Sequence, residues 1–361
     1  MNTSLPAGPT GLLASVTGPD EAEIALAGGA DIIDLKDPAK GALGAVAPDV
    51  LVATLARIAG RRPVSAVAGD LPMEPDAVCA AVALRRSADH VKIGLFPASA
   101  ADRRAVVAAL SQEAARTSLI AVFFADGDPD FSLLADLKAA GFSGAMIDTM
   151  NKGSGGLLKH LPTAEIAAFV ESCRTFDLIS GLAGSLEPPD VPRLAVLRPH
   201  YLGFRGALTT GGRAGPIDPL AVAAMRALID AEQDRRVAPD NAPTDRIFVR
   251  DMVVEMEIGA YGFERGQRQS VRFTVEGDVV RTASRDDRMV SVYSYDIIMD
   301  AVRRLVARGH TDLVETLAED LAEMLLADPR LRRVLVRVEK LQLGPAAVGI
   351  EIRRPDAGSR L

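Results

Sequence analysis

Residues 28–36 read Gly-Gly-Ala-Asp-Ile-Ile-Asp-Leu-Lys, a glycine pair followed by a short apolar run that ends on a charged residue. A glycine pair ends helices, and a run rich in branched apolar residues favours a β-strand. Upstream, Pro19 and Asp20 mark the start of a helix that is expected to run to Ala27. The stretch therefore predicts a helix followed by a buried strand, with Lys36 at the carboxyl end of that strand.

The same alternation of short apolar runs and Ala- and Leu-rich helical segments recurs from Leu12 to about Glu232. Eight strands are expected: Leu12–Ser15, Asp31–Leu35, Pro63–Val67, His90–Ile93, Leu119–Phe124, Gly144–Ile147, Leu178–Gly181 and Tyr201–Phe204. Eight apolar strands alternating with helices over about 220 residues predict an α/β fold, the (βα)8 TIM barrel. A doubly wound open sheet is the alternative, but it usually has fewer strands and a glycine fingerprint that is missing here.

The composition excludes several classes of protein. The chain has 361 residues, a net charge of −7, 48% hydrophobic residues and 25% charged residues, which suits a two-domain globular protein. An acidic chain lacks the basic face of a nucleic-acid-binding protein. No apolar run approaches the ~18 residues of a membrane span, and no signal peptide is evident. Two distant cysteines and four scattered histidines give no metal signature. We expect a cytoplasmic protein with no metal or cofactor and no nucleic-acid or membrane partner.

Residues 234–244, DRRVAPDNAPT, are polar, contain two prolines and show no periodicity. They predict a linker between a barrel domain at 1–233 and a second domain at 245–361. In the second domain we expect two strands within Arg246–Glu276, joined by a turn near Gly262–Gly266. Two helices and two strands follow, at Asp296–Arg308, Asp312–Leu326, Arg333–Lys340 and Val348–Arg353. A ββααββ order in about 110 residues predicts a small α+β domain.

Lysine is scarce in this chain, since only seven of the 41 Lys plus Arg residues are lysines. Arginine stays protonated and cannot replace lysine where a neutral amine must act as a nucleophile. Lys36, Lys92 and Lys152 lie on or just after the second, fourth and sixth expected strands, where barrel active sites are built. Asp34, two residues before Lys36, is expected to face the same side, and Asp148 is expected to pair with Lys152.

We expect these three lysines to lie on one wall of the barrel mouth. Clustered cations in a partly buried site lower the pKa of one amine, which can then form a Schiff base with a carbonyl. The remaining lysines and the two aspartates would bind phosphate or transfer protons. Ordinary ion pairs at strand ends are the alternative, and they are the commoner explanation for any single lysine. Five such residues converging on one rim favour a functional site.

Glycine-rich loops follow the last two expected strands. Gly184 and Ser185 follow the seventh, and Gly206 and Gly212 follow the eighth. Loops at these positions of a barrel often bind phosphate through backbone N–H groups, and Arg205 is expected to add a bidentate contact. The alternative is that these glycines serve only tight turns.

Six segments together resemble the (5-formylfuran-3-yl)methyl phosphate synthase family over about residues 10–233: DIIDLKDPAKGALGA (31–45), VSAVAGDLP (64–72), ADHVKIGL (88–95), GAMIDTMNKG (144–153), GLAGSL (181–186) and GFRGAL (203–208). This family makes a furan for methanofuran biosynthesis from two molecules of glyceraldehyde 3-phosphate, on a class I aldolase-like barrel without a metal. The resemblance implies that Lys36 forms the Schiff base and that four further residues complete the site: Asp34, Lys92, Asp148 and Lys152. The family often has Asn after the Schiff-base lysine, where this chain has Asp37.

The second domain resembles the dihydroneopterin aldolase family over about residues 245–354, on IGAYGFER (258–265) with Gln269, YSYD (293–296), LVETLAE (313–319), Lys340 and VGI (348–350). The resemblance implies a tunnelling fold that assembles into rings. It also implies that Glu315 anchors a pterin ring and that Glu264, Tyr295 and Lys340 carry the side-chain chemistry. The family usually has Pro after that lysine, where this chain has Leu341.

We therefore expect a furan phosphate synthase fused to an aldolase-type domain, acting on triose phosphate and a dihydropterin and supplying coenzymes of one-carbon metabolism. The ring-forming habit of the second family implies a homo-oligomer. The alternative is a class I Schiff-base aldolase that acts on another sugar phosphate, with the second domain serving only for oligomerisation. A third hypothesis is a phosphate-metabolite binding or scaffold protein with a degenerate barrel.

Overall fold

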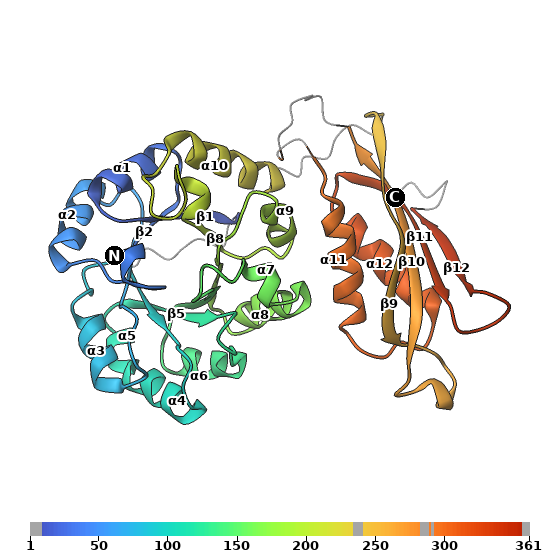
Figure 1. Cartoon of the computed structure of the whole chain (residues 1–361), viewed down its shortest axis with the longest axis horizontal. Coiled ribbons are helices and arrows are strands. Elements are labelled where there is room, and N and C mark those ends of the chain that lie inside the picture. The colour runs from blue at the N-terminus through green and yellow to red at the C-terminus, as the bar shows by residue number, and fades with distance from the viewer. Residues whose placement is uncertain (1–8, 234–240, 282–288, 290–291, 356–361) are drawn as a thin grey trace. The chain divides into compact units, whose positions relative to one another are not determined.

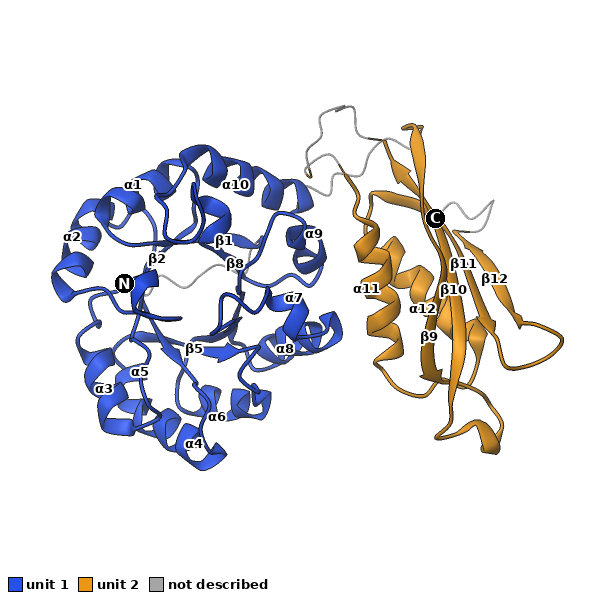
Figure 2. Ribbon diagram, viewed as in Figure 1, with its two compact units in different colours: residues 1–233 blue, residues 234–361 orange. Residues whose placement is uncertain are grey.

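The computed structural model describes residues 9–233, 241–281, 289 and 292–355. The chain forms two compact units, residues 1–233 and 234–361 (Figure 2). Most of the expected linker at 234–244 lies outside the described residues, but its last residue, Thr244, already belongs to a strand.

The first unit is a closed barrel in which eight parallel strands follow one another in chain order. The strands are β1 Gly11–Val16, β2 Ile32–Leu35, β3 Val64–Val67, β4 His90–Gly94, β5 Ser118–Phe124, β6 Gly144–Asp148, β7 Ile179–Leu182 and β8 Tyr201–Phe204. They are buried along nearly their whole length, as strands enclosed by helices must be. The predicted TIM barrel is therefore confirmed, and the ends of all eight strands lie within one residue of the expected ones.

Helices surround the barrel on its outside (Figure 1). They are α1 Pro19–Ala27, α2 Pro48–Ile58, α3 Pro75–Ala83, α4 Ala100–Ala109, α5 Ser111–Ala114, α6 Leu134–Ala139, α7 Leu157–His160, α8 Thr163–Thr175, α9 Asp190–Ala195 and α10 Pro219–Gln233. The first three of these helices each have proline in their first turn. Proline suits that position because its fixed φ is helical and the N–H that it lacks would have no partner within the helix.

The barrel closes where β1 pairs with β8, with Gly11 opposite Tyr201. Side-chain hydrogen bonds reinforce this seam next to the amino-terminal ends of β1 and β8. The Thr10 hydroxyl donates to the carbonyl of Pro199 over 2.8 Å, and the Gln233 amide at the end of α10 donates to the carbonyl of Thr10 over 2.7 Å. The first and last segments of the unit are thus joined directly.

Strand register brings polar side chains together at one level of the barrel interior. Ser15 on β1 lies opposite Asp34 on β2, which in turn lies opposite Ser65 on β3. Deeper positions such as Leu13 and Ile32 are apolar and belong to the core. The interior therefore changes from apolar to charged as the strands approach their carboxyl ends, where barrel active sites are built.

The second unit is a four-stranded antiparallel sheet with two helices, in the order β12-β11-β10-β9. Its elements are β9 Thr244–Glu257, β10 Arg268–Val280, α11 Tyr295–Val306, α12 Val314–Leu326, β11 Leu331–Lys340 and β12 Val348–Arg354. Burial alternates residue by residue along β10, because one face of the sheet is packed and the other is exposed. The predicted ββααββ order and the small α+β fold are both confirmed.

No helix within the described residues is long and apolar enough to span a membrane.

Candidate active site

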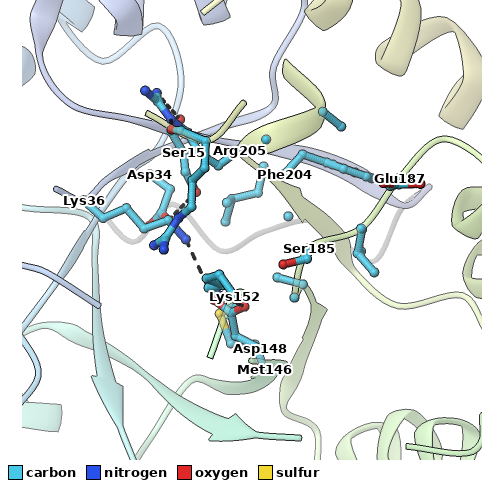
Figure 3. Close-up of a pocket in the computed structure, with 18 of the residues that line it drawn as sticks. Ser15, Asp34, Lys36, Met146, Asp148, Lys152, Ser185, Glu187, Phe204 and Arg205 are labelled. Atoms are coloured by element: carbon cyan, nitrogen blue, oxygen red, sulfur yellow. Dashed lines mark hydrogen bonds and ion pairs between the residues drawn. The ribbon is translucent and has the colours of Figure 1, made fainter. Parts of the chain in front are cut away.

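A pocket of about 350 Å³ opens at the carboxyl ends of the barrel strands. All five charged residues that the sequence singled out line it: Asp34, Lys36, Lys92, Asp148 and Lys152. Figure 3 shows Asp34 and Lys36 on one side of the pocket and Asp148 with Lys152 on another. The structure therefore brings together residues that come from three different strands.

Asp34 lies at the centre of a buried hydrogen-bond network. Its carboxylate accepts a hydrogen bond from Ser65 over 2.6 Å and pairs with the Lys92 ammonium at 2.7 Å. The Ser15 hydroxyl donates to its second oxygen over 3.1 Å. Burial acts to raise the pKa of Asp34, but the charges of Lys92 and Lys36 and these hydrogen bonds outweigh burial and lower it. Asp34 is therefore an anion that holds Lys92 in place.

Asp148 is shared between two lysines. It forms a short ion pair with Lys152 and lies 3.8 Å from the Lys36 amine. It also accepts a hydrogen bond from the backbone N–H of Thr149 over 2.7 Å. Burial opposes ionisation of Asp148, but Lys152 and Lys36 lower its pKa to about 2. This carboxylate stays charged and keeps two amines within reach of one another.

Burial has the opposite effect on the lysines. It lowers the pKa of Lys92 and that of Lys152, although the carboxylates of Asp34 and Asp148 oppose the change. The Lys36 charge lowers both values further. Amines in such surroundings give up a proton more readily than exposed lysines, which is the property that acid–base catalysis by lysine requires.

The expectation that the three lysines share one wall was wrong. Lys92 lies on β4, whereas Lys36 directly follows β2 and Lys152 lies in the loop after β6, and these strands alternate around the closed barrel. Alternate strands point their side chains into the same layer of a barrel interior, so the lysines meet at the centre from different sides. Asp34 and Asp148 then connect them.

Three of the four glycine-loop positions expected to bind substrate line this pocket, namely Gly184, Ser185 and Gly206. Gly184 has a φ of 114°, and a Cβ there would come within 3.2 Å of the Thr149 backbone nitrogen. Glycine is therefore required for the β7 loop to approach the β6 loop so closely. Gly212 is not among the described residues that line the pocket, but its neighbour Arg213 is.

Arg205 lines the pocket but is already fully engaged. Its guanidinium pairs with Glu21, with contacts of 2.6 and 3.2 Å, and donates to the backbone carbonyls of three residues: Ser15, Arg213 and Gly215. All five N–H donors of an arginine are thus in use. The expectation of a bidentate phosphate contact is corrected, since this side chain instead anchors the β8 loop to β1 and α1.

Arg213 is the pocket cation that the sequence analysis missed. Its guanidinium donates to the carbonyl of Gly41 over 3.2 Å, and it has no ion pair with any carboxylate in the described residues. It therefore keeps donors for an anionic ligand. Its position directly after the glycine pair at 211–212 was the available signal. Ser15 and Ser65 were missed as well, because short hydroxyl residues inside strands carry no distinctive pattern.

A second charged cluster lies in the C-terminal unit. Glu264 and Lys340 form an ion pair of 2.5 Å, and Gln269 donates to the Glu264 carboxylate over 3.1 Å. The backbone N–H of Tyr261 donates to the other carboxylate oxygen over 3.1 Å. The hydrogen bond from Lys340 is the main cause that lowers the pKa of Glu264 to about 2. The three side chains are buried together.

Unlike this buried cluster, the other two residues that the resemblance implies are exposed. Tyr295 is 59% exposed at the start of α11, and Glu315 is exposed at the start of α12. Neither forms a hydrogen bond or an ion pair with Glu264 or Lys340 among the residues that the structure describes. A single chain therefore assembles only part of the constellation that the resemblance implies.

Comparison with known proteins gives two family matches. The model of the dihydroneopterin aldolase family matches residues 247–353. A crystal structure of dihydroneopterin aldolase from Burkholderia thailendensis, bound to guanine, is 36% identical and covers 32% of this chain and 94% of that chain, with a TM-score of 0.29. The C-terminal unit is thus a dihydroneopterin aldolase-type domain.

The model of the 4-HFC-P synthase family matches residues 12–226. A protein of Methylorubrum extorquens, provisionally named (5-formylfuran-3-yl)methyl phosphate synthase, is 47% identical over 55% of this chain and 81% of its own length. The Methanosarcina mazei protein of that name is 29% identical over 57% of this chain and 93% of its own length. The chain belongs to the 4-HFC-P synthase family.

Proposed function

We propose that the barrel unit condenses two molecules of glyceraldehyde 3-phosphate into (5-formylfuran-3-yl)methyl phosphate through a Schiff base on Lys36, for the biosynthesis of a methanofuran-type coenzyme. Six carbons enter and six remain in the product, so the balance requires release of one phosphate and two molecules of water. The observation that carries the proposal is the shared pocket in which Asp148 lies between Lys36 and Lys152 while Asp34 holds Lys92. Membership of the 4-HFC-P synthase family supports the choice of substrate.

The first step is attack of the Lys36 amine on a triose phosphate carbonyl, which expels water and leaves a protonated imine. The imine withdraws electrons from the neighbouring carbon, so that loss of a proton there gives an enamine. The enamine then loses the phosphate of the first triose, and the terminal carbon left behind becomes the nucleophile. The second triose phosphate moves its carbonyl from its first to its second carbon by proton transfer, and the nucleophile bonds to that carbonyl carbon. The first-carbon hydroxyl of the second triose closes the ring, loss of two molecules of water completes the furan, and hydrolysis of the imine leaves the formyl group and restores the lysine.

Proton transfer in these steps is assigned to the lysines rather than to the aspartates. A general acid or base works best when its pKa lies near the working pH. The pKa of Asp148 is about 2, so this carboxylate is a poor proton donor at neutral pH. Burial lowers the pKa values of Lys92 and Lys152 from the ordinary value of a lysine. We assign the two carboxylates to holding the amines and stabilising positive charge.

Phosphate binding is assigned to the β7 and β8 loops. Gly184, Ser185 and Gly206 present backbone to the pocket, and Arg213 supplies a cation without a carboxylate partner. Backbone N–H groups of glycine-rich loops at this end of a barrel commonly bind phosphate.

The decisive test is incubation of the purified chain with glyceraldehyde 3-phosphate, followed by mass analysis of the products. The furan phosphate and an equal amount of inorganic phosphate are expected. Borohydride should trap a triose adduct on Lys36, and Lys36→Ala should abolish both trapping and turnover. Lys40→Ala is the matched control, because Lys40 lies four residues away, is exposed and pairs with Asp37 at 3.1 Å outside the pocket.

The second candidate for the barrel is a class I aldolase that acts on another sugar phosphate. The same lysine cluster favours it, since both reactions begin with a Schiff base. Retro-aldol products without a furan would establish this alternative. A chain that binds phosphate compounds but traps no adduct would instead be a binding protein.

For the C-terminal unit we propose 7,8-dihydroneopterin aldolase activity, supported by the buried Glu264–Gln269–Lys340 cluster and by the family match. Glycolaldehyde release from 7,8-dihydroneopterin is the test, and Lys340→Ala should remove it. The incomplete constellation in one chain favours assembly into a homo-oligomer. Absence of glycolaldehyde, with an oligomer still present on size-exclusion chromatography, would assign the unit to assembly alone.

A further inference from the structure

A second, much smaller cavity lies inside the barrel beneath Lys92. Its volume is about 10 Å³, close to the minimum that holds one water molecule. Its lining combines three apolar residues with four that carry polar side chains: Leu13, Ile32, Ile120, Ser65, His90, Lys92 and Tyr201. Lys92 and Leu13 line both this cavity and the active-site pocket, so the two spaces are neighbours.

His90 places an unpartnered nitrogen in this interior. The residue is 4% exposed, and its Nδ1 lies 2.7 Å from the Ser118 hydroxyl. Its Nε2 is buried and has no hydrogen-bond partner among the residues that the structure describes. His90 and Lys92 are two residues apart on β4, so both side chains point toward the barrel interior. A buried polar atom is normally satisfied by protein or by ordered water.

The surrounding charges favour a neutral imidazole. Burial lowers the pKa of His90, the Lys92 charge acts in the same direction, and only Asp89 opposes the change. A neutral ring that donates from Nδ1 to Ser118 leaves a lone pair on Nε2. Lys92 itself faces Asp34 and Lys36 from the β2 side, Asp148 from β6 and the Tyr201 ring from β8. One of its three N–H donors is taken by Asp34.

We propose that this cavity binds one water molecule that accepts a hydrogen bond from Lys92 and donates one to Nε2 of His90. His90 is then a positioning residue that acts on the reaction through Lys92. The water satisfies the buried nitrogen and fixes a second donor of the ammonium, leaving the third to face the substrate pocket. The water site stands on geometry alone, while its effect on turnover rests on the proposed furan-forming function.

The first test is a crystal structure of the whole chain at a resolution that shows ordered water. A water within hydrogen-bond distance of both His90 Nε2 and Lys92 Nζ is expected. A dry cavity would overturn the proposal. This measurement needs no substrate, so it holds even if the chain makes no furan product.

The second test compares His90→Phe with His90→Gln. Phenylalanine removes the acceptor and fills the cavity, which disfavours the charged form of Lys92. The high-pH limb of kcat for furan formation should therefore move to lower pH by about one unit, a tenfold change in the proton equilibrium. Glutamine can still accept a hydrogen bond from the water, so its profile should stay near that of the unaltered chain.

His200→Gln is the matched control. His200 is another barrel histidine whose Nδ1 lies 3.0 Å from a strand serine, Ser180, but it lines neither cavity. Its pH profile should not change. A folded His90→Phe chain with an unshifted profile would refute the positioning role. If His90→Phe does not fold, a profile of the folded His90→Gln chain that is shifted by about one unit would refute the role instead. Failure of the unaltered chain to form furan contradicts only the proposed function.

Discussion

At the scale of single residues, the pocket is defined by an imbalance of charge. Lys36, Lys92 and Lys152 share two carboxylates, so these five side chains carry one net positive charge when all three amines are protonated. Burial strengthens the effect of that surplus, because a low-dielectric interior screens charge weakly. A phosphorylated substrate compensates the excess positive charge. The arrangement thus favours anionic substrates before any specific contact forms.

Arg213→Gln should raise the KM for triose phosphate about tenfold or more, because a charge-assisted hydrogen bond contributes roughly 1.5–3 kcal/mol. The thermal midpoint should stay nearly constant, since among the described residues this side chain donates a hydrogen bond only to the Gly41 carbonyl. Steady-state kinetics with a calorimetric scan checks both. An unchanged KM would remove Arg213 from the phosphate site.

Arg205→Gln should give the reverse result. The variant removes the cation that pairs with Glu21, which keeps only its hydrogen bonds from Thr17, and it removes the donors of three backbone carbonyls. These losses should destabilise the barrel by on the order of 3 kcal/mol. Chemical denaturation of the two variants in parallel measures the difference. A stable Arg205→Gln protein with a raised KM would restore the direct phosphate contact that the structure argues against.

Asp148 should make the barrel sensitive to acid. Its pKa is lowered from 3.8 in the unfolded chain to about 2 in the folded one, so protons bind more tightly to the unfolded state. The resulting stability, about 2 kcal/mol, is present above pH 4 and is lost as the pH falls toward 2. Urea unfolding of the native chain and Asp148→Asn across this range should show their difference in stability shrinking. A constant difference would contradict the assigned ionisation.

The site residues that the sequence revealed best belong to a residue type that is rare in this chain. Lys36, Lys92 and Lys152 stood out because the chain uses so few lysines. The prediction that Arg205 binds phosphate was wrong, because its partner Glu21 is 184 residues away in the sequence and no local pattern reveals that ion pair. His90 carries no distinctive local pattern either. Its role depends on a cavity formed by side chains of several strands.

At the scale of elements, close contacts between neighbouring strands decide where glycine is essential. A Cβ on Gly181 of β7 would lie 2.3 Å from the ring of Tyr201 on β8. Both residues are fully buried, so neither the ring nor the strand can move away cheaply. Glycine at this position is what admits a tyrosine to the barrel interior.

Gly181→Ala should therefore destabilise the barrel by about 1–3 kcal/mol, the usual cost of overpacking a core. Gly206→Ala is the control, because a Cβ there meets no atom within 4 Å. Its thermal midpoint should match that of the unaltered chain, whatever happens to substrate binding. Equal midpoints for both variants would show that the Tyr201 ring can shift.

The elements themselves were the most predictable feature, because apolar runs and helix signals are local. The second strand was expected to begin at Asp31, but it begins at Ile32. The Asp31 carboxylate accepts a hydrogen bond from the N–H of Leu12 and pairs with Arg226, contacts that sequence alone does not reveal. The error lay in placing the three lysines on one wall, because β2, β4 and β6 are spread around the closed sheet.

At the scale of the whole molecule, the chain divides into two compact units after residue 233. Residues 1–233 expressed alone should fold cooperatively and still form the borohydride-trapped adduct on Lys36. The reason is that every residue assigned to the furan-forming site lies within that unit. Circular dichroism and trapping of the shortened chain test this. An unfolded product would show that the second unit is needed to stabilise the barrel.

The seam between β1 and β8 also bears on how a ribosome produces this protein. Thr10 and Pro199, which bond across the seam, are separated by 189 residues. During synthesis β1 therefore has no β8 to pair with until the end of the barrel is made. Until then the nascent barrel has two unpaired strand edges. The free backbone N–H and C=O groups of an unpaired strand edge form hydrogen bonds with strands of other chains, which leads to aggregation. Translation pauses before β8, or a shortage of chaperones, should consequently increase aggregation of the newly made polypeptide more than pauses after Gln233.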